Sequence, residues 1–487
     1  MEAPLGVAHL TAEYWPYART GGLGEAVSGL SSCQAAVGMP TTVIMPLYRV
    51  VRDTTPTLER AGPPFNVALG NRTETAWLYR AQDASAQGVP QVFFIEHPDF
   101  FDRAGIYGDD TGDYSDNALR FAFFCAAALT VLPDVAPATQ VVHAHDWHAA
   151  LAPVYLRTRF AGDEFYDRLA TVMSVHNAGF QGHFSPETVG TLGLSPELYD
   201  ARHFEWYGRM NALKGGLAFS DCAVTVSPRH ALELCTAEGG FGLHDTFIGM
   251  GDRLVGILNG IDAQAWNPET DPHIAANFSA DDLAGKRRCK AALQRAYGLS
   301  QRATTPLFGM SARLVSQKGL DLVLGADLIG STDAQYIFLG AGEHRYHAAL
   351  AELAVAHPDR IAVEFAFTDH LEHRLLSGAD LLLMPSLYEP CGLTQMRAQR
   401  YGAIPVARAV GGLRDSIVDG QTGILFEEYT PAALQGAIRR ALEAAADRTT
   451  WRHLVRQAMA LPFGWEGSAL RYLEVYRRAV SIHPVAA

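Results

Sequence analysis

One local pattern limits the possible folds of this chain more than any other: an apolar run, a Gly/Pro turn and a helical segment. Its clearest example is an apolar run at residues 380–385, a turn at 386–392 (SLYEPCG) and helical spacing from 393 to 401. Backbone N–H groups at such a helix start lack partners and attract anions. Glu389 is a carboxylate at the lip of this turn. A plain strand-to-helix turn is the equal alternative.

The same pattern opens the chain. An apolar run at residues 5–11 precedes RTGGLG at residues 19–24 and a helical pattern that Gly38 ends. The adjacent glycines Gly21 and Gly22 would let backbone amides approach a phosphate, and Arg19 could pair with it. The loop is neither GxGxxG nor a Walker P-loop, which disfavours a nicotinamide dinucleotide. A surface turn is again the alternative.

Alternating strand and helix patterns continue through both halves of the chain. They predict two doubly wound α/β domains, which also suits a length of 487 residues. We expect an N-terminal Rossmann-like domain over residues 1–254, a second over 255–466, and a C-terminal helix and tail at 467–487 that pack back on the first domain. Strands are expected at residues 5–11, 41–46, 92–96, 141–148, 171–175, 223–227, 306–312, 336–339, 361–367, 381–385, 404–407 and 423–426.

Composition excludes some function classes. The net charge of -13 argues against a general binder of nucleic acid or anionic membranes, so an anionic ligand needs a local basic cluster. Six scattered cysteines without a CxxC pair indicate a reducing compartment and no zinc site. No signal-like N-terminus and no run of membrane-spanning length are expected, which together predict a cytoplasmic protein.

Two successive predicted strands end in polar side chains. The first ends in HAHDWH at residues 143–148, and the second in His176 and Asn177. Ligands gather at the carboxyl ends of strands in open parallel sheets, so one shared site is expected. A metal is not favoured, because His143 and His145 share one face of an extended strand while Asp146 points to the other, and no further ligand is clear.

Two loops offer further binding groups. Arg313 and Lys318 lie in a loop after a predicted strand, where they form either a solvated turn or a clamp for a leaving diphosphate. Residues 103–117 form a long polar loop typical of a lid or binding segment. Its Tyr107 could stack on a base or sugar, or simply pack.

With these motifs in place, the chain resembles the bacterial glycogen synthase and plant starch synthase family. The matching segments are RTGGLGEAVSGL, HAHDWHAALAPVYL, SVHNAGFQG, TVSPRHALEL, GILNGID, ARLVSQKGLDLVL, LGAGE, LYEPCGLTQM and GGLRDSIVDGQTG. The resemblance implies a GT-B fold, two Rossmann-like domains facing a cleft. It also implies retaining transfer of glucose from a nucleotide diphosphate sugar, expected to be ADP-glucose, to the non-reducing end of an α-1,4-glucan, with no metal ion and no cofactor.

The resemblance also implies roles for individual residues. Arg313 and Lys318 would hold the leaving diphosphate, and Glu389 would bind the glucose hydroxyls. His176 would lie beside the donor glucose with its carbonyl facing the anomeric carbon, and Asp146 and Asn259 would complete the sugar site. Further contacts to phosphate, glucose or base would come from Gly21, Gly22, Tyr107, Cys391, Gly392, Leu393 and Thr394.

Three positions depart from the family pattern. Arg19 stands where Lys is usual, Glu25 where Asp is usual, and His244 where an acidic residue is usual. Arg and Lys are not equivalent at a phosphate or ribose contact. Two alternatives therefore stay open: a related retaining glycosyltransferase with another donor, such as UDP-glucose, or another acceptor, and a weakly active protein that binds glucan or sugar nucleotide.

Overall fold

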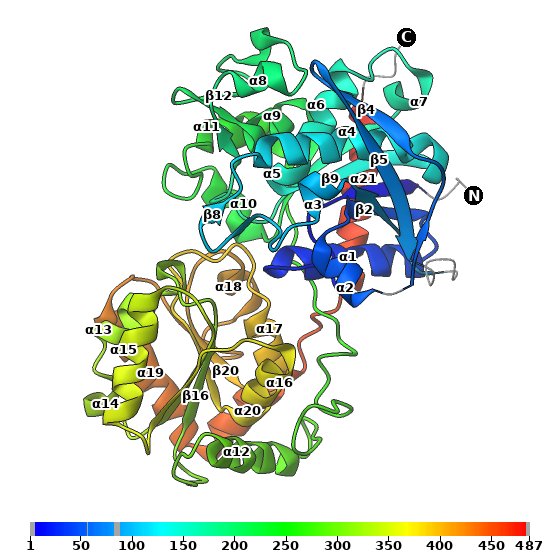
Figure 1. The fold of residues 1–487 in the computed structure, drawn as a ribbon. Helices are drawn as coiled ribbons and strands as arrows, with labels where there is room; N and C mark the ends of the chain where they lie inside the picture. Colours follow the sequence, from blue (N-terminus) through cyan, green and yellow to red (C-terminus); the bar gives the residue numbers. More distant parts are fainter. Residues whose placement is uncertain (1–4, 56, 82–87, 484–487) are drawn as a thin grey trace. The chain divides into compact units, whose positions relative to one another are not determined.

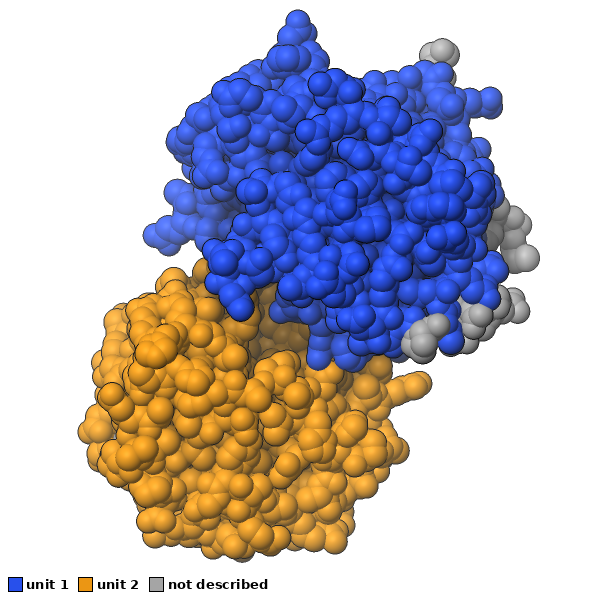
Figure 2. Space-filling model, viewed as in Figure 1, with its two compact units in different colours: residues 1–260, 465–487 blue, residues 261–464 orange. Residues whose placement is uncertain are grey.

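A computed structural model describes residues 5–55, 57–81 and 88–483, and these divide into two compact units (Figures 1 and 2). Unit 1 comprises residues 1–260 and 465–487, and unit 2 comprises residues 261–464. The sequence pattern predicted a boundary after residue 254. Strand β15 (Leu254–Gly256) still pairs with the sheet of unit 1 in parallel.

The central sheet of unit 1 is parallel over seven strands, in the order β15-β14-β10-β9-β1-β2-β6. Chain order runs outward in both directions from β1, so the winding reverses between β1 and β9. Such a switch point is where ligands bind in open α/β sheets. The strands are β1 (Gly6–Leu10), β2 (Thr41–Pro46), β6 (Gln91–Glu96), β9 (Thr139–His145), β10 (Ala170–Val175), β14 (Cys222–Thr225) and β15.

Unit 1 also has antiparallel strands that the sequence analysis did not predict. Strand β5 is antiparallel to β6, and β3 and β4 pair with β5. Strands with one exposed face carry apolar side chains only at alternate positions and do not stand out as apolar runs. These elements are β3 (Leu58–Arg60), β4 (Phe65–Leu69), β5 (Arg72–Ala81), the β7–β8 hairpin (Gly108–Asp109, Gly112–Asp113), and the small sheet of β11 (His183–Phe184), β12 (Glu205–Trp206) and β13 (Arg209–Asn211).

The last helix of the chain, α21 (Glu466–Ile482), packs in unit 1. Its apolar side chains share a buried cluster with residues of β1, β9, β10 and β14 and with α1 (Gly22–Ala36). Figure 1 shows α21 in red among the blue and cyan elements of unit 1. The other main helices here are α2 (Arg49–Thr54), α3 (Pro98–Phe101), α4 (Asn117–Val135), α5 (Asp146–Ala149), α6 (Leu151–Thr158), α9 (Ala212–Phe219), α10 (Pro228–Leu234) and α11 (His244–Met250).

Helix α4 corrects one expectation. With 19 residues and a mean hydropathy of 1.6, it is long and apolar enough to cross a membrane by length and composition alone. No run of this length was predicted from the sequence. Most of the helix is buried inside unit 1, where Phe121, Phe123 and Phe124 contact the core. A buried core helix accounts for the same composition.

Unit 2 holds a six-stranded parallel sheet in the order β18-β17-β16-β19-β20-β21. In chain order this is 3-2-1-4-5-6, the Rossmann arrangement, with its switch point between β16 and β19. The strands are β16 (Leu307–Ser311), β17 (Gln335–Leu339), β18 (Ile361–Glu364), β19 (Leu381–Met384), β20 (Ile404–Arg408) and β21 (Ile424–Phe426). The helices are α12 (Ala284–Ala296), α13 (Leu320–Gly325), α14 (Leu328–Ser331), α15 (His344–Ala356), α16 (Asp369–Gly378), α17 (Thr394–Arg400), α18 (Gly411–Ser416), α19 (Pro431–Ala446) and α20 (Arg448–Met459).

Candidate active site

The switch point of unit 2 brings the predicted basic loop onto the turn at Glu389. Lys318 follows β16, and Glu389 follows the neighbouring strand β19. The Lys318 ammonium lies 2.6 Å from Glu389 Oε2, and the Ser386 hydroxyl donates to the same oxygen at 3.0 Å. Glu389 is buried, whereas 19% of the Lys318 side chain is exposed. A cation and an anion are thus held together at the edge of the sheet.

Gly319 allows these two loops to approach. Its φ of +75° lies in the left-handed region, and a Cβ there would stand 1.9 Å from the Pro385 carbonyl oxygen. The Leu387 N–H also donates to the Gln317 carbonyl at 2.8 Å. A side chain at position 319 would push the Lys318 loop away from the Glu389 turn.

Several polar groups at this edge have no partner in the described part of the chain. They are the exposed Arg313 guanidinium and the backbone N–H groups of Gly392, Leu393 and Thr394. Gly392 adopts a φ of +69°, which turns the chain into α17. Cys391 is buried beside them. The edge therefore offers two cations and three donors to an anion or a hydroxyl-rich ligand.

At the switch point of unit 1, Glu13 occupies the glycine loop. Its carboxylate accepts hydrogen bonds from the backbone N–H groups of Thr20 at 2.7 Å and Gly21 at 3.3 Å, and from the Thr20 hydroxyl at 2.7 Å. The Tyr107 hydroxyl donates to it at 2.6 Å. The Gly21 amide, which the sequence analysis assigned to a phosphate or sugar, thus already binds a buried carboxylate. The Gly22 amide has no partner among the described residues.

Two of the departures from the family pattern form one ion pair. The Arg19 guanidinium contacts the Glu25 carboxylate, and about a fifth of each side chain is exposed. The guanidinium also lies over the Trp15 ring, 4.0 Å from its centroid. The changes at positions 19 and 25 are therefore coupled, since a longer, planar cation meets a longer carboxylate. His244, the third departure, begins α11 and lies 3.7 Å from the exposed Asp245 carboxylate.

The structure brings Asp146 and His176 together at the adjacent ends of β9 and β10. The His176 backbone N–H donates to Asp146 Oδ1 at 2.7 Å, and Asp146 has a φ of +55°. Burial raises the Asp146 pKa to about 7 and lowers the His176 pKa to about 3. At neutral pH the His176 ring is therefore uncharged.

Tyr107 packs against another ring, whereas one side-chain atom of Asn259 has no hydrogen-bond partner among the described residues. One face of the Tyr107 ring stacks on His148, with centroids 4.5 Å apart. Asn259 Oδ1 is buried and has no partner among the described residues. A buried acceptor of this kind is uncommon and calls for a ligand or an ordered water.

Three buried histidines in unit 1 lie close enough to suggest a metal site. Ring nitrogens of His9, His143 and His145 lie within 4.8 Å of one another. All six ring nitrogens of these residues already have protein partners within 3.0 Å, so no lone pair is left to converge on an ion. The arrangement fits a hydrogen-bonded network better than a metal centre.

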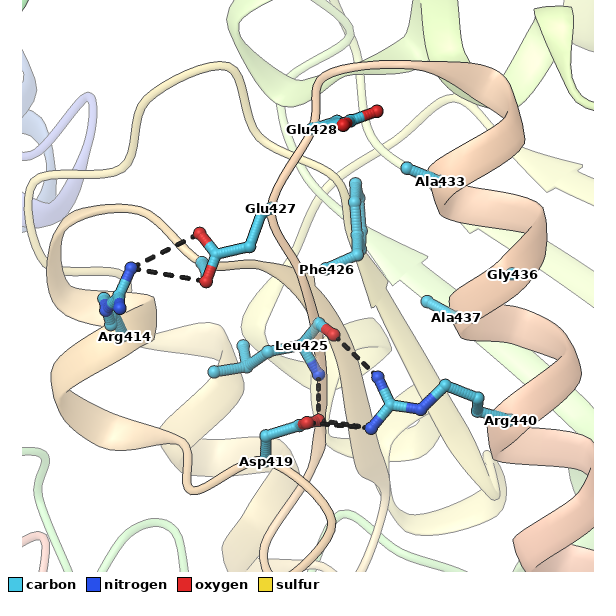
Figure 3. Close-up of a pocket in the computed structure, with 11 residues that line it drawn as sticks. Arg414, Asp419, Leu425, Phe426, Glu427, Glu428, Ala433, Gly436, Ala437 and Arg440 are labelled. Carbon is cyan, nitrogen blue, oxygen red and sulfur yellow. Dashed lines mark hydrogen bonds and ion pairs between the residues drawn. The ribbon is translucent and has the colours of Figure 1, made fainter.

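A pocket of about 550 Å³ lies elsewhere in unit 2, between β21, α18 and α19 (Figure 3). Exposed ion pairs line it, with 2.8 Å between Arg440 and Asp419 and 3.3 Å between Arg414 and Glu427. It includes none of the site residues predicted from the sequence. Because its charges are paired with each other, it is a weaker candidate than the switch points.

No role was predicted from the sequence for Glu13, His9 or Gln34. His9 lies within an apolar strand, and Gln34 follows Val27 and Leu30 on the same face of α1. A polar residue in a buried pattern is the only signal available for such positions. Their partners come from distant parts of the chain.

Comparisons with known proteins agree with this architecture. The family model "Starch synthase catalytic domain" matches residues 6–248, and "Glycosyl transferases group 1" matches residues 299–457. The glycogen synthase of Syntrophotalea carbinolica is 42% identical over 479 residues, covering 97% of this chain and 98% of that protein. Glycogen synthase 2 of Geobacter sulfurreducens is 39% identical over 480 residues, covering 97% and 98%.

Solved structures of related proteins share this fold. The catalytic domain of starch synthase IV from Arabidopsis thaliana, bound to ADP and acarbose, is 32% identical with a TM-score of 0.89, covering 98% of this chain and 100% of that one. Sucrose-phosphate synthase from Thermosynechococcus elongatus is 18% identical with a TM-score of 0.61, which shows a shared fold alone. The predicted GT-B fold and family resemblance are confirmed: this chain belongs to the family of glycogen synthases and starch synthases.

Proposed function

We propose that this protein is a cytoplasmic glycogen synthase that transfers glucose from ADP-glucose to the non-reducing end of an α-1,4-glucan. The observation that carries the proposal is the Lys318–Glu389 pair at the switch point of unit 2, with Arg313 exposed beside it. Family membership and the ADP in the related starch synthase support the donor assignment.

In the proposed reaction, the bond between the glucose anomeric carbon and the diphosphate oxygen breaks. The bond to the acceptor hydroxyl forms on the same face of the sugar, and the acceptor proton passes to the leaving diphosphate. Lys318 and Arg313 stabilise the negative charge that grows on the diphosphate. The amides of Gly392, Leu393 and Thr394 supply further donors.

On the sugar side, Glu389 accepts hydrogen bonds from hydroxyl groups of the donor glucose, and Lys318 pairs with its carboxylate. From unit 1, His176 and Asp146 contact the donor glucose in this proposal, and the unsatisfied Asn259 Oδ1 accepts a hydrogen bond from a ligand. His176 is neutral, so it does not oppose positive charge on the sugar. Base stacking by Tyr107 and a sugar contact from Cys391 stay predictions.

The first experiment measures nucleotide release from ADP-glucose and UDP-glucose, each with and without glycogen. Primer-dependent ADP release with polymer growth is expected. Glu389→Gln keeps the size of the side chain and removes the charge, so kcat should fall about 100-fold or more.

The matched control is Glu427→Gln in the separate pocket of unit 2, which should leave kcat unchanged. Turnover with UDP-glucose alone, or with a small acceptor in place of glycogen, would favour the alternative of another transferase. Full polymer synthesis by Glu389→Gln would contradict the assigned site.

A further inference from the structure

A continuous chain of buried hydrogen bonds leads from helix α1 to His176. Gln34 Oε1 lies 2.8 Å from His9 Nε2, His9 Nδ1 lies 2.9 Å from His145 Nε2, and His145 Nδ1 lies 3.0 Å from His176 Nε2. Gln34, His9 and His145 are fully or almost fully buried. Only the last ring, His176, reaches partial exposure.

Each of the three histidines in this series of hydrogen bonds, His9, His145 and His176, carries a single ring proton at neutral pH. Burial lowers the pKa of His9 to about 4 and that of His176 to about 3, and it holds the His145 pKa well below its usual range. A neutral imidazole has one N–H donor and one acceptor nitrogen. The ring nitrogen that carries the proton in one histidine therefore determines which nitrogen carries it in the next.

Gln34 determines which partner donates in each hydrogen bond of the series. Its Oε1 can only accept, so His9 must donate from Nε2, and its Nδ1 then accepts from His145 Nε2. By the same rule His145 Nδ1 accepts from His176 Nε2. The His176 proton thus points into the protein, and Nδ1 is left as an acceptor with no partner among the described residues.

A rotated Gln34 amide would reverse every bond. Its NH₂ group would then donate to His9, each ring would move its proton to Nδ1, and His176 would present a donor. In the structure the Gln34 NH₂ group donates instead to the Tyr476 hydroxyl of α21 at 3.0 Å. The Tyr476 hydroxyl also contacts His143 Nδ1 at 2.8 Å, so it has a second partner for its own proton.

We infer that Gln34 is a positioning residue that sets the tautomer of His176, so that His176 Nδ1 accepts a hydrogen bond from a hydroxyl of the transferred sugar. The sugar contact rests on the proposed function, whereas the tautomer does not. The backbone of His176 is held separately, by Asp146. Ring polarity and ring position are thus controlled by different residues.

The test uses the full chain labelled with ¹⁵N-histidine and two-bond ¹H–¹⁵N correlation spectra, which distinguish protonated from unprotonated ring nitrogens. The His176 signals are assigned by their loss in His176→Gln. The parent protein should show His176 protonated at Nε2 and unprotonated at Nδ1.

Two variants at position 34 separate the acceptor role from packing. Gln34→Leu removes the acceptor, so the His176 tautomer should become mixed and kcat should fall about tenfold, the value of one neutral hydrogen bond. Gln34→Glu restores an acceptor beside His9 and should keep the Nε2–H tautomer and most of the activity. Both variants lose the side-chain N–H group that donates to Tyr476, so loss of that bond alone would affect them alike.

The control is Ser174→Ala, which removes the partner of His143 Nε2 at 2.7 Å but leaves the Gln34–His176 chain intact. It should leave the His176 signals unchanged. A parent His176 protonated at Nδ1, or a His176 tautomer that Gln34→Leu leaves unchanged, would overturn the inference. An altered tautomer with unchanged kcat would overturn the sugar contact, and correct tautomers in a protein without transferase activity would overturn only the proposed function.

Discussion

The two switch points share a topology and differ in chemistry. At the edge of unit 2, Arg313 is exposed, Lys318 and Glu389 form an ion pair, and backbone donors are unoccupied within the described chain. At the edge of unit 1, buried neutral histidines form hydrogen bonds with one another, and Glu13 occupies the glycine loop. The same winding thus gives one edge with an exposed cation and backbone donors without a partner among the described residues, and another built from a buried hydrogen-bonded network.

Acid should affect the histidine-rich unit most. Because burial lowers these pKa values, the unfolded state binds more protons below about pH 6.5, and stability is lost as the pH falls toward the folded-state values. Each buried histidine contributes up to about 1.4 kcal/mol per pH unit, so the six together should lower the stability of unit 1 by roughly 10 kcal/mol between about pH 6.5 and 5. The histidines are His9, His143, His145, His148, His176 and His230.

Asp146 acts in the opposite direction. Its pKa is raised to about 7, so its stabilising effect is present at low pH and is lost as the pH rises through about 7. One carboxyl group offsets only part of the effect of six histidines. Urea unfolding at several pH values, with hydrogen exchange of peptides from β9 and β10, measures the net slope.

His148→Phe is a matched variant for this titration. Phenylalanine can keep the stack on Tyr107, and His148 Nδ1 has no partner among the described residues, so little hydrogen bonding is lost. The pH slope should fall by about one proton. An unfolding midpoint that stays constant from pH 7.5 to 5 would contradict the view of unit 1 as a neutral, buried network.

Lys318→Ala tests the charged edge of unit 2. It removes a cation from the proposed diphosphate site and leaves Glu389 buried without its ammonium partner. We expect kcat to fall about 1,000-fold, equivalent to about 4 kcal/mol of transition-state stabilisation. Arg439→Ala, which removes an exposed cation of α19, should have no effect on kcat. Equal losses in the two variants would mean that net charge, not position, matters.

Substitutions in the Arg19–Glu25 pair should change activity less than Lys318→Ala does. A double-mutant cycle with Arg19→Lys and Glu25→Asp should give a coupling energy of about 1 kcal/mol, because the pair is partly exposed. The double variant, which restores the usual family pair, should keep kcat/KM closer to the parent than either single variant. Strictly additive losses would show that the two positions changed independently.

The pocket in Figure 3 should show the smallest effect. Arg440→Ala breaks an exposed ion pair with Asp419, so stability should change by less than about 1 kcal/mol. Nucleotide release should stay within about twofold of the parent if the pocket has no part in the reaction. A tenfold loss of nucleotide release would instead indicate that the sugar nucleotide binds at this pocket.

The strand order and the meeting of Lys318 with Glu389 follow from local patterns. Buried parallel strands are apolar runs, and ligand-binding loops follow them, so the sequence identifies both. The antiparallel strands β4 and β5 lack that signal. The roles of Glu13 and Gln34 depend on partners such as Tyr107 and Tyr476, 94 and 442 residues away in the chain, and such contacts exist only after folding.

Helix α21 has a consequence for synthesis on the ribosome. Unit 2 is one continuous segment, whereas unit 1 needs helix α21 to complete its core and to place Tyr476 against Gln34 and His143. Domains often fold in the order in which they emerge. Here the half that is translated first can finish folding only after α21 has been translated, so the nascent chain holds an incomplete N-terminal core throughout the synthesis of unit 2.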